Sequence, residues 1–378
     1  MKICCIADIH LGMKLYGKTD PVTHFNSREL NTLDNLRGVV DYCIDNDIKV
    51  LIIAGDTYHN SLPTPTLQDE VNKIIKYASD NDIHCLILAG NHDVSKLDTA
   101  VTALKPLDTF HINNVVHTKQ FKDMRLTVND EQVRFVFLPT YHTGEGIKEI
   151  TDKIQYDGTP IVYIGHMTVQ GAALNDWLIG TNESYVDMSC FKHDGVKATV
   201  LGHLHKPQIL DEEKMIFYTG SLQRLDFNEE NQKKGFFVLD VSDDKDTTYT
   251  YHEVDSQLFY TLSLNVIGNI NSFDYVKKMI AVDRVKNAIV RIKLEADSAS
   301  KLTTGQEKDI YEYLQSLGAD TILNIQQKVT DNEKVRNAAI TEYVSMDKGL
   351  ELYFDNQLRK DERIKLGKKI LDMVNGND

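Results

Sequence analysis

The sequence VLIIAGDTYH at residues 50–59 places an unbroken apolar run directly before a Gly-Asp pair. An apolar run without alternation is typical of a strand that is covered on both faces. The same pattern recurs in KICCIADIH at residues 2–10 and in HCLILAGNHD at residues 84–93. Amphipathic patterns near 28–46 and 66–80 lie between these runs and predict helices. This alternation predicts a parallel sheet whose strands carry polar residues at their carboxyl ends, where open α/β sheets bind ligands.

The chain between about 131 and 255 is rich in predicted strands. Two of these, IVYIGH at 161–166 and KATVLGHLH at 197–205, bring a Gly-His pair to the end of an apolar run. We expect a second sheet that faces the first, so that both sheets deliver residues to one edge. The sequence therefore predicts an α/β fold with two facing mixed β-sheets flanked by helices, including a helix near 96–105.

The chain divides into three predicted parts. Residues 1–257 carry the two sheets, and residues 258–330 follow with a compact strand, helix, strand, helix, strand series that predicts a small α/β domain. Residues 331–378 form a tail with two amphipathic patterns, near 347–358 and 360–374, which predict helices.

The composition is typical of a globular protein without a membrane anchor. Of the 378 residues 42% are apolar, and no stretch approaches the roughly 18 consecutive apolar residues of a membrane helix. Asp8 interrupts the apolar run at the N-terminus, which we interpret as a buried strand and not a signal peptide. The 5 cysteines include no CxxC pair, so we expect reduced core residues and a cytoplasmic location.

The formal net charge of −14 argues against a polyanionic partner if the charge is averaged over the molecule. Bound divalent cations and a local basic groove can offset such an average. Net charge alone therefore does not exclude nucleic acid.

Seven residues at predicted strand ends have the chemistry of a two-metal site. Two ions roughly 3.5 to 4 Å apart need a bridging carboxylate with oxygen and imidazole ligands around it. Asp56 is the natural bridge. The spacing suggests the following set: Asp8, His10 and His205 for the first ion, and Asn91, His166 and His203 for the second. This mixture of oxygen and imidazole ligands, without thiolate, favours manganese, iron or zinc over calcium, and we expect Mn²⁺.

Three further residues are candidates for the chemistry of a phosphoester. His92 directly follows Asn91 and is placed to stabilise the transition state and to protonate the leaving oxygen. We expect Asp93 to orient His92, and His59 to reach the substrate phosphate. No cofactor other than the two metal ions is expected.

These motifs resemble the calcineurin-like metallophosphoesterase superfamily, and within it the SbcD-type nuclease subunits of the double-strand-break repair complex. The narrower resemblance is carried by GDTYH at 55–59 and by YTGSLQRLDFNEE at 218–230, which has Thr219 where that family usually has proline. It implies a manganese-dependent nuclease with 3′ to 5′ exonuclease activity on duplex ends and endonuclease activity on single strands. It also implies that the domain at 258–330 caps the DNA.

The resemblance further implies a homodimer formed through helices of the phosphoesterase domain, and an SMC-like ATPase bound by the C-terminal helices. For DNA contact the sequence offers five basic residues near the motifs: Lys14, Lys18, Arg28, Lys206 and Arg224. Two alternatives stay open, a phosphodiesterase or phosphomonoesterase of small substrates and a non-catalytic scaffold that loads an ATPase on DNA ends.

Overall fold

The computed structural model describes residues 1–95, 102–109, 112–140, 142–174, 184–330, 351 and 360–374. By contacts the chain divides into two units. The first comprises 1–261, 282–290 and 314–323, and the second comprises 262–281, 291–313 and 324–378. No helix among the described residues is long and apolar enough to cross a membrane.

The first sheet of unit 1 contains the three apolar runs that open the chain. Its strand order is β12-β11-β1-β2-β3-β4, and β1 to β4 run parallel. The bounds are Lys2–Ile6 for β1, Val50–Ala54 for β2, His84–Leu88 for β3, Val115–Thr118 for β4, Gly235–Asp240 for β11 and Thr248–Glu253 for β12. The predicted parallel sheet is therefore confirmed, with an antiparallel extension at β11 and β12.

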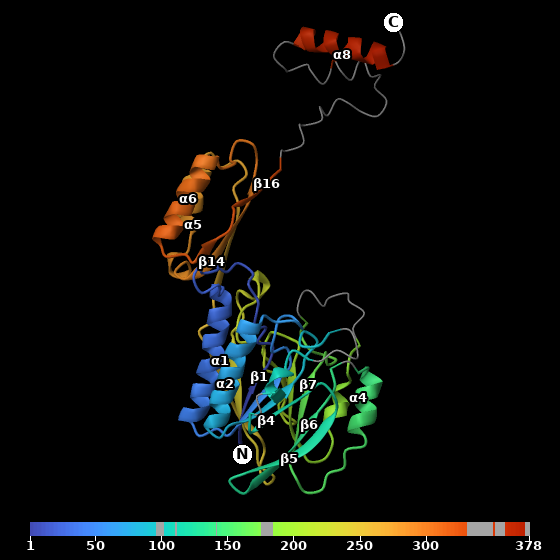
Figure 1. The fold of residues 1–378 in the computed structure, drawn as a ribbon. Helices are drawn as coiled ribbons and strands as arrows, with labels where there is room; N and C mark the ends of the chain where they lie inside the picture. Colours follow the sequence, from blue (N-terminus) through green and yellow to red (C-terminus); the bar gives the residue numbers. More distant parts are fainter. Residues whose placement is uncertain are drawn as a thin grey trace. The chain divides into compact units, whose positions relative to one another are not determined.

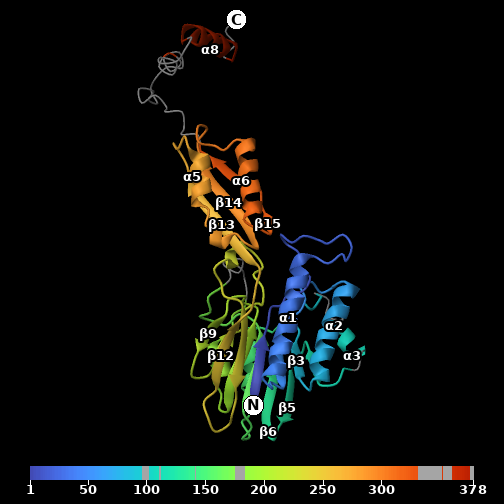
Figure 2. The same cartoon turned by 90° about the vertical axis from the view of Figure 1, so that its left-hand side faces the viewer.

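Two helices cover one face of this sheet. Helix α1 spans Ser27–Asp45 and begins with a capping box in which Asn26 and Glu29 satisfy each other's backbone amides. Helix α2 spans Pro65–Asp80, with Thr64 as its N-cap. The two helices lie side by side in both views (Figures 1 and 2). Their apolar faces pack on one side of β1, β2 and β3 in a common core.

The second sheet has the order β5-β6-β7-β8-β10-β9. Its strands span Lys122–Val128 (β5), Glu131–Phe137 (β6), Ile161–His166 (β7), Val196–Gly202 (β8), Gln208–Asp211 (β9) and Ile216–Tyr218 (β10). The segments that pack on its outer face include helix α4 at Gly144–Thr151 and the 3-10 helix η2 at Met188–Phe191. A 3-10 helix η3 follows at Phe227–Glu229.

The inner faces of the two sheets share one apolar core. Alternate residues of β1 and β2, such as Cys5 and Ile52, meet Phe135, Val162 and Val200 from the second sheet. The layers are thus helix, sheet, sheet and helix, which confirms the predicted fold class. Because β1 to β3 and β6 to β8 are each parallel sets, their carboxyl ends collect the loops that follow them.

A third sheet follows residue 257, with the order β13-β14-β15 and β16 paired to β14. The elements are β13 (Leu258–Asn265), α5 (Ser272–Met279), the 3-10 helix η4 (Val282–Arg284), β14 (Ala288–Ala296), α6 (Thr304–Ser316), β15 (Thr321–Ile322) and β16 (Gln326–Val329). This order agrees with the predicted alternation of strands and helices.

The remaining predicted helices have different outcomes. Of the helix expected near 96–105, residues 96–101 lie outside the described part, and 103–105 form a turn before the short helix α3 at Pro106–Thr109. In the tail, a helix at 360–374 was predicted and α8 spans Lys360–Val374. The helix expected at 347–358 lies outside the described residues except for Glu351.

Candidate metal centre

The seven predicted ligands form one cluster of contacts at the carboxyl ends of β1, β2, β3, β7 and β8. The ligand atoms of Asp8, His10 and His205 all lie within 4.8 Å of one another, and so do those of Asp8, Asp56 and His166. Asn91 joins the cluster because its Oδ1 lies 3.0 Å from His166 Nε2 and 3.3 Å from a nitrogen of His203. Residues far apart in the chain therefore reach one site.

The first half-site consists of Asp8, His10 and His205, all of which are buried. His10 Nε2 and His205 Nε2 face each other at 3.1 Å. His205 Nδ1 donates to Oε1 of Glu229 at 2.7 Å. This hydrogen bond fixes the tautomer of His205 and leaves the lone pair of Nε2 directed at His10, as in the carboxylate–histidine pairs of metal sites.

Glu229 is in turn held by Lys234, a residue that no sequence pattern singled out. Lys234 Nζ lies 2.7 Å from the second carboxylate oxygen of Glu229, and the lysine side chain is fully buried. The same ammonium donates to the carbonyl of His205 at 2.9 Å and to Ser221 Oγ at 2.8 Å. Burial favours neutral Glu229, but Lys234 and His205 outweigh it and hold the pKa of the carboxyl below its ordinary value.

The second half-site consists of Asn91, His166 and His203. His166 Nδ1 donates to the backbone carbonyl of Ala54 at 2.9 Å, which directs Nε2 toward Asn91 and Asp56. Burial favours the neutral imidazole, but the neighbouring carboxylate of Asp56 prevails and raises the pKa of His166 to about 9. The ring therefore lies in a strongly negative environment, which also suits a cation.

Asp56 lies between the two half-sites. Its Oδ2 is 3.3 Å from His166 Nε2 and 3.7 Å from His10 Nε2. Burial favours the neutral acid, yet the surrounding histidines lower the pKa of Asp56 far below its ordinary value. Its other oxygen accepts the backbone amide of His92 at 2.8 Å. A carboxylate in this position can bridge two cations.

The loops adopt backbone conformations that most residues avoid. Asp8, His10, Asp56 and His203 all have positive φ, with values of 50°, 49°, 51° and 93°. Such conformations cost energy and are found where the surrounding structure enforces them, frequently at functional sites. Here the loops after β1 and β2 are joined by hydrogen bonds, including His10 N to Asp56 O at 3.0 Å.

Two glycines permit the close approach of these loops. A Cβ on Gly55, which has φ of +95°, would lie 2.1 Å from His166 Nδ1, and a Cβ on Gly90 would lie 2.1 Å from Asp56 Oδ1. Both positions therefore require glycine. Gly165 is less constrained, because the nearest atoms to a Cβ at that position are side-chain atoms at 3.1 Å.

His92 and His59 lie next to the first half-site, with ring centroids 4.9 Å and 5.5 Å from that of His10. The prediction that Asp93 orients His92 was wrong. The carboxylate of Asp93 accepts the backbone amides of Thr57, Tyr58 and Gly90, so it braces the loops. Burial raises its pKa to about 7. His92 is oriented instead by His59, whose carbonyl oxygen lies 2.8 Å from His92 Nδ1.

Of the five basic residues expected to contact DNA, Arg28 is buried and Arg224 is partly buried. Arg28 is 2% exposed, and its guanidinium donates to the carbonyl of Arg224 and lies over the ring of Phe259. Arg224 donates to the carbonyls of Ser256, Gln257 and Gln232. Both arginines therefore join chain segments within the described structure.

The other three basic residues are accessible. Lys14 pairs with Glu29 at 3.3 Å, and Lys18 pairs with Asp320; the two lysine side chains are 50% and 65% exposed. Lys206 is exposed directly after the first half-site ligand His205. The side chains of all three lysines are accessible from solvent.

The donor set fits divalent cations. Two buried carboxylates and several imidazoles converge without thiolate, and His166 and His205 each have one nitrogen fixed by a hydrogen bond so that the other is available as a ligand. Glu229 and Lys234 were missed at the level of sequence because they act through His205. The only signal was the position of Glu229 in the segment 218–230.

Comparison with known proteins agrees with this arrangement. Residues 1–207 match the family described as calcineurin-like phosphoesterase, which is more than half of the chain. The chain belongs to this family.

A more particular likeness is to the SbcD subunit of the nuclease SbcCD from Staphylococcus epidermidis, which is 36% identical over 107 residues. That match covers 27% of this chain and 27% of the relative, so the chain aligns with about a quarter of that protein. Among solved structures, a dimetal phosphatase from Danio rerio has 11% identity and a TM-score of 0.38, with 63% of this chain and 92% of that chain covered. The protein TT1561 of Thermus thermophilus has 10% identity and a TM-score of 0.38, with 66% and 98% covered.

Proposed function

We propose that this protein is a DNA nuclease with a two-ion centre. In this proposal Asp8, His10 and His205 hold one ion, Asn91, His166 and His203 hold the other, and Asp56 bridges them. The observation that carries the proposal is the position of the Asp56 carboxylate, 3.3 Å from a histidine of one half-site and 3.7 Å from a histidine of the other. The partial likeness to an SbcCD nuclease subunit supports DNA as the substrate.

The roles of the chain's own residues follow from their hydrogen bonds. Two bound divalent ions, which we expect to be Mn²⁺, would polarise the phosphate and supply an activated water. The Nδ1 of His92 is engaged by the carbonyl of His59, so Nε2 is the atom left to protonate the leaving oxygen. His59 would contact the phosphate. Asp93 contributes indirectly, since it braces the loops that carry Asp56 and His92.

The further activities and partners are part of the same proposal. The chain would degrade duplex ends from 3′ to 5′, cut single strands, act as a homodimer in the cytoplasm and cap DNA with residues 258–330. The tail at 331–378 would bind an SMC-like ATPase. In its described helix α8, Leu366 is 61% exposed and Ile364 is half-buried, which gives part of an apolar surface for a partner. Deletion after residue 335 should abolish ATPase binding in a pull-down while leaving the nuclease folded.

One assay tests the substrate class. The purified chain is given an end-labelled duplex, a circular single strand and bis(p-nitrophenyl) phosphate, in Mn²⁺ and in Mg²⁺, with and without the candidate ATPase and ATP. Cleavage of both DNA substrates in Mn²⁺ supports the proposal. Cleavage of the small ester alone would replace it with a phosphodiesterase of small substrates.

A substitution separates the nuclease from a non-catalytic scaffold. His92→Asn should reduce DNA cleavage by on the order of 10²–10⁴-fold, because it removes the proton donor. Metal binding, measured by calorimetry, should remain close to that of the wild type, since His92 is not among the proposed ligands. Unchanged cleavage would refute the role of His92, and absence of cleavage in the wild type would favour the scaffold.

A further inference from the structure

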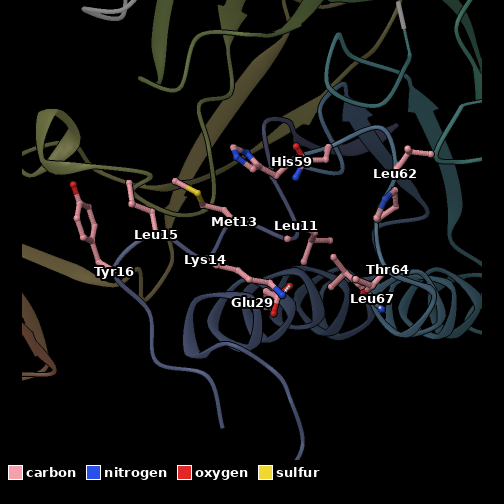
Figure 3. Close-up of a pocket in the computed structure, with 13 residues that line it drawn as sticks. Leu11, Met13, Lys14, Leu15, Tyr16, Glu29, His59, Leu62, Thr64 and Leu67 are labelled. Carbon is pink, nitrogen blue, oxygen red and sulfur yellow. Dashed lines mark hydrogen bonds and ion pairs between the residues drawn. The ribbon is translucent and has the colours of Figure 1, made fainter. Parts of the chain in front are cut away.

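A groove of about 650 Å³ lies beside His59 in unit 1. Its walls come from the loop after β1 and the loop before α2, and Figure 3 shows His59 and Met13 between Leu15 on one side and Leu62 on the other. The volume falls within the range of about 300–1,000 Å³ that is usual for small-ligand pockets. The lining is mainly apolar.

The apolar rim of this groove is unusually exposed. Leu62 is 89% exposed and Leu15 is 44% exposed, and they stand on different walls of the same groove. Single exposed leucines are ordinary, but a groove with large apolar residues on both rims is typical of a binding site. Such a surface suits a flat, partly apolar ligand.

His59 borders both the groove and the candidate metal centre. This side chain lines the groove, and its ring is 5.5 Å from that of His10 and stacks at 5.5 Å on that of His92. His59 Nδ1 is buried and has no hydrogen-bond partner among the described residues. A ligand in the groove therefore lies next to the group that would be cleaved at the centre.

The wall after β1 is held in place before any ligand binds. Met13 N donates to His10 O at 3.1 Å, Gly17 N donates to Lys14 O at 3.0 Å, and Lys14 pairs with Glu29 at 3.3 Å. Tyr16, at the end of this wall, is fixed by an edge contact with Phe227, with centroids 5.3 Å apart. A preformed apolar surface with an anchored aromatic ring can stack a nucleobase.

We propose that this groove binds the nucleoside next to the reacting phosphodiester. The inference rests on the proposed nuclease function. It adds a second site of substrate recognition, for the nucleoside as well as for the phosphate. Stacking and apolar contact make the groove tolerant of base identity, because each base presents a similar flat face. A nucleoside that is unpaired reaches the groove more easily than one inside a duplex.

The test compares esters that differ in the nucleoside. The p-nitrophenyl esters of thymidine 5′-phosphate and thymidine 3′-phosphate carry a nucleoside, and bis(p-nitrophenyl) phosphate carries no nucleoside. The double variant Leu15→Ser with Leu62→Ser should lower kcat/KM for at least one thymidine ester about tenfold or more relative to the nucleoside-free ester. Leu62→Ser alone should show part of the effect. Leu30→Ser, an exposed leucine of α1 that does not line the groove, is the matched control.

The outcomes are distinguishable from failure of the nuclease proposal. An equal loss on all esters, or no loss on either thymidine ester, overturns the groove assignment. A change in oligomeric mass without a change in this ratio assigns the groove to a contact with a second copy of the chain. If the wild type cleaves no ester, the nuclease proposal fails. In that case, fluorescence anisotropy in EDTA can still measure the binding of pentathymidylate. The groove assignment predicts that the double variant binds this oligonucleotide more weakly than the wild type.

Discussion

The two half-sites of the metal centre hold their histidines by different means. In the first, a charged pair is used, since His205 donates to Glu229 and Glu229 is paired with the buried Lys234 at 2.7 Å. In the second, a backbone group fixes the ring, since His166 donates to the carbonyl of Ala54, while its other nitrogen faces Asn91 and the Asp56 carboxylate. A buried ion pair keeps its geometry only while both charges are present, whereas a backbone carbonyl cannot be removed by mutation. The first half-site should therefore be the more sensitive to substitution.

The largest expected effect is on stability, from removal of the Lys234 charge. Lys234→Met leaves the Glu229 carboxylate buried without its cation, and we expect a loss of about 3–5 kcal/mol in the free energy of unfolding. Urea denaturation of the metal-free protein measures it. The double variant Glu229→Gln with Lys234→Met removes both charges and should recover most of the loss. A single variant as stable as the wild type would show that the pair does not brace the half-site.

The second expected effect is on metal affinity, from removal of the Glu229 charge. Glu229→Gln keeps an acceptor for His205 but lowers the basicity of its imidazole, and we expect about 10–100-fold weaker binding of one of two ions. Isothermal titration with Mn²⁺ resolves the two sites. The matched control is Glu230→Gln, since Glu230 also forms an ion pair, with Arg284, but does not touch a proposed ligand. Equal weakening of both ions would contradict the assignment of Glu229 to one half-site.

The third expected effect is a difference in pH dependence between the half-sites. Burial lowers the pKa of His10 well below its ordinary value, so His10 is already neutral at pH 7. His166, with a pKa of about 9, must lose a proton when a metal binds. Affinity for the ion of the second half-site should therefore fall about tenfold per pH unit below 9. His10 should add no such pH dependence to the affinity for the ion of the first half-site. Proton release measured by titration in buffers of different ionisation enthalpy checks this.

The same raised pKa affects the stability of the metal-free protein. The contribution of His166 is fully present below the ordinary pKa of 6.5 and is lost as pH rises through about 9. An affinity for the second ion that stays constant from pH 6.5 to pH 8.5, with no proton release on binding, would count against this account of the second half-site.

The smallest expected effect comes from Ser221, which accepts one of the hydrogen bonds of Lys234 at 2.8 Å. Ser221→Ala leaves Lys234 with Glu229 and the carbonyl of His205, so we expect a loss of about 1 kcal/mol in the free energy of unfolding. A loss as large as that of Lys234→Met would show that hydrogen bonding, and not charge, holds the first half-site.

The positions of the ligands could be predicted because two simple patterns coincide. Unbroken apolar runs predict strands that are buried on both faces, and residues that follow parallel strands collect at one edge. Asp8, Asp56 and Asn91 follow β1, β2 and β3 in this way, and His166 ends β7. The left-handed backbone at Asp8, His10 and Asp56 could not be predicted, because the hydrogen bonds that enforce it join loops distant in the chain.

Indirect roles were beyond the reach of the sequence. Asp93 follows His92 directly, but the turn aims its carboxylate at the amides of the loop after β2. Arg28 and Arg224 are basic residues near the motifs, yet packing buries the first, and backbone carbonyls accept hydrogen bonds from both terminal nitrogens of the second. Charge is visible in a sequence, whereas accessibility is a property of the packed molecule.

The sequence by itself determined the two sheets, the edge at which they meet and the identity of seven candidate ligands, because local hydrophobic patterns and spacing encode them. Only the tertiary structure decided how those ligands are oriented. Glu229 lies 24 residues beyond His205, and Ala54 lies 112 residues before His166. Such hydrogen bonds depend on the exact approach of distant segments, and no local pattern specifies that distance.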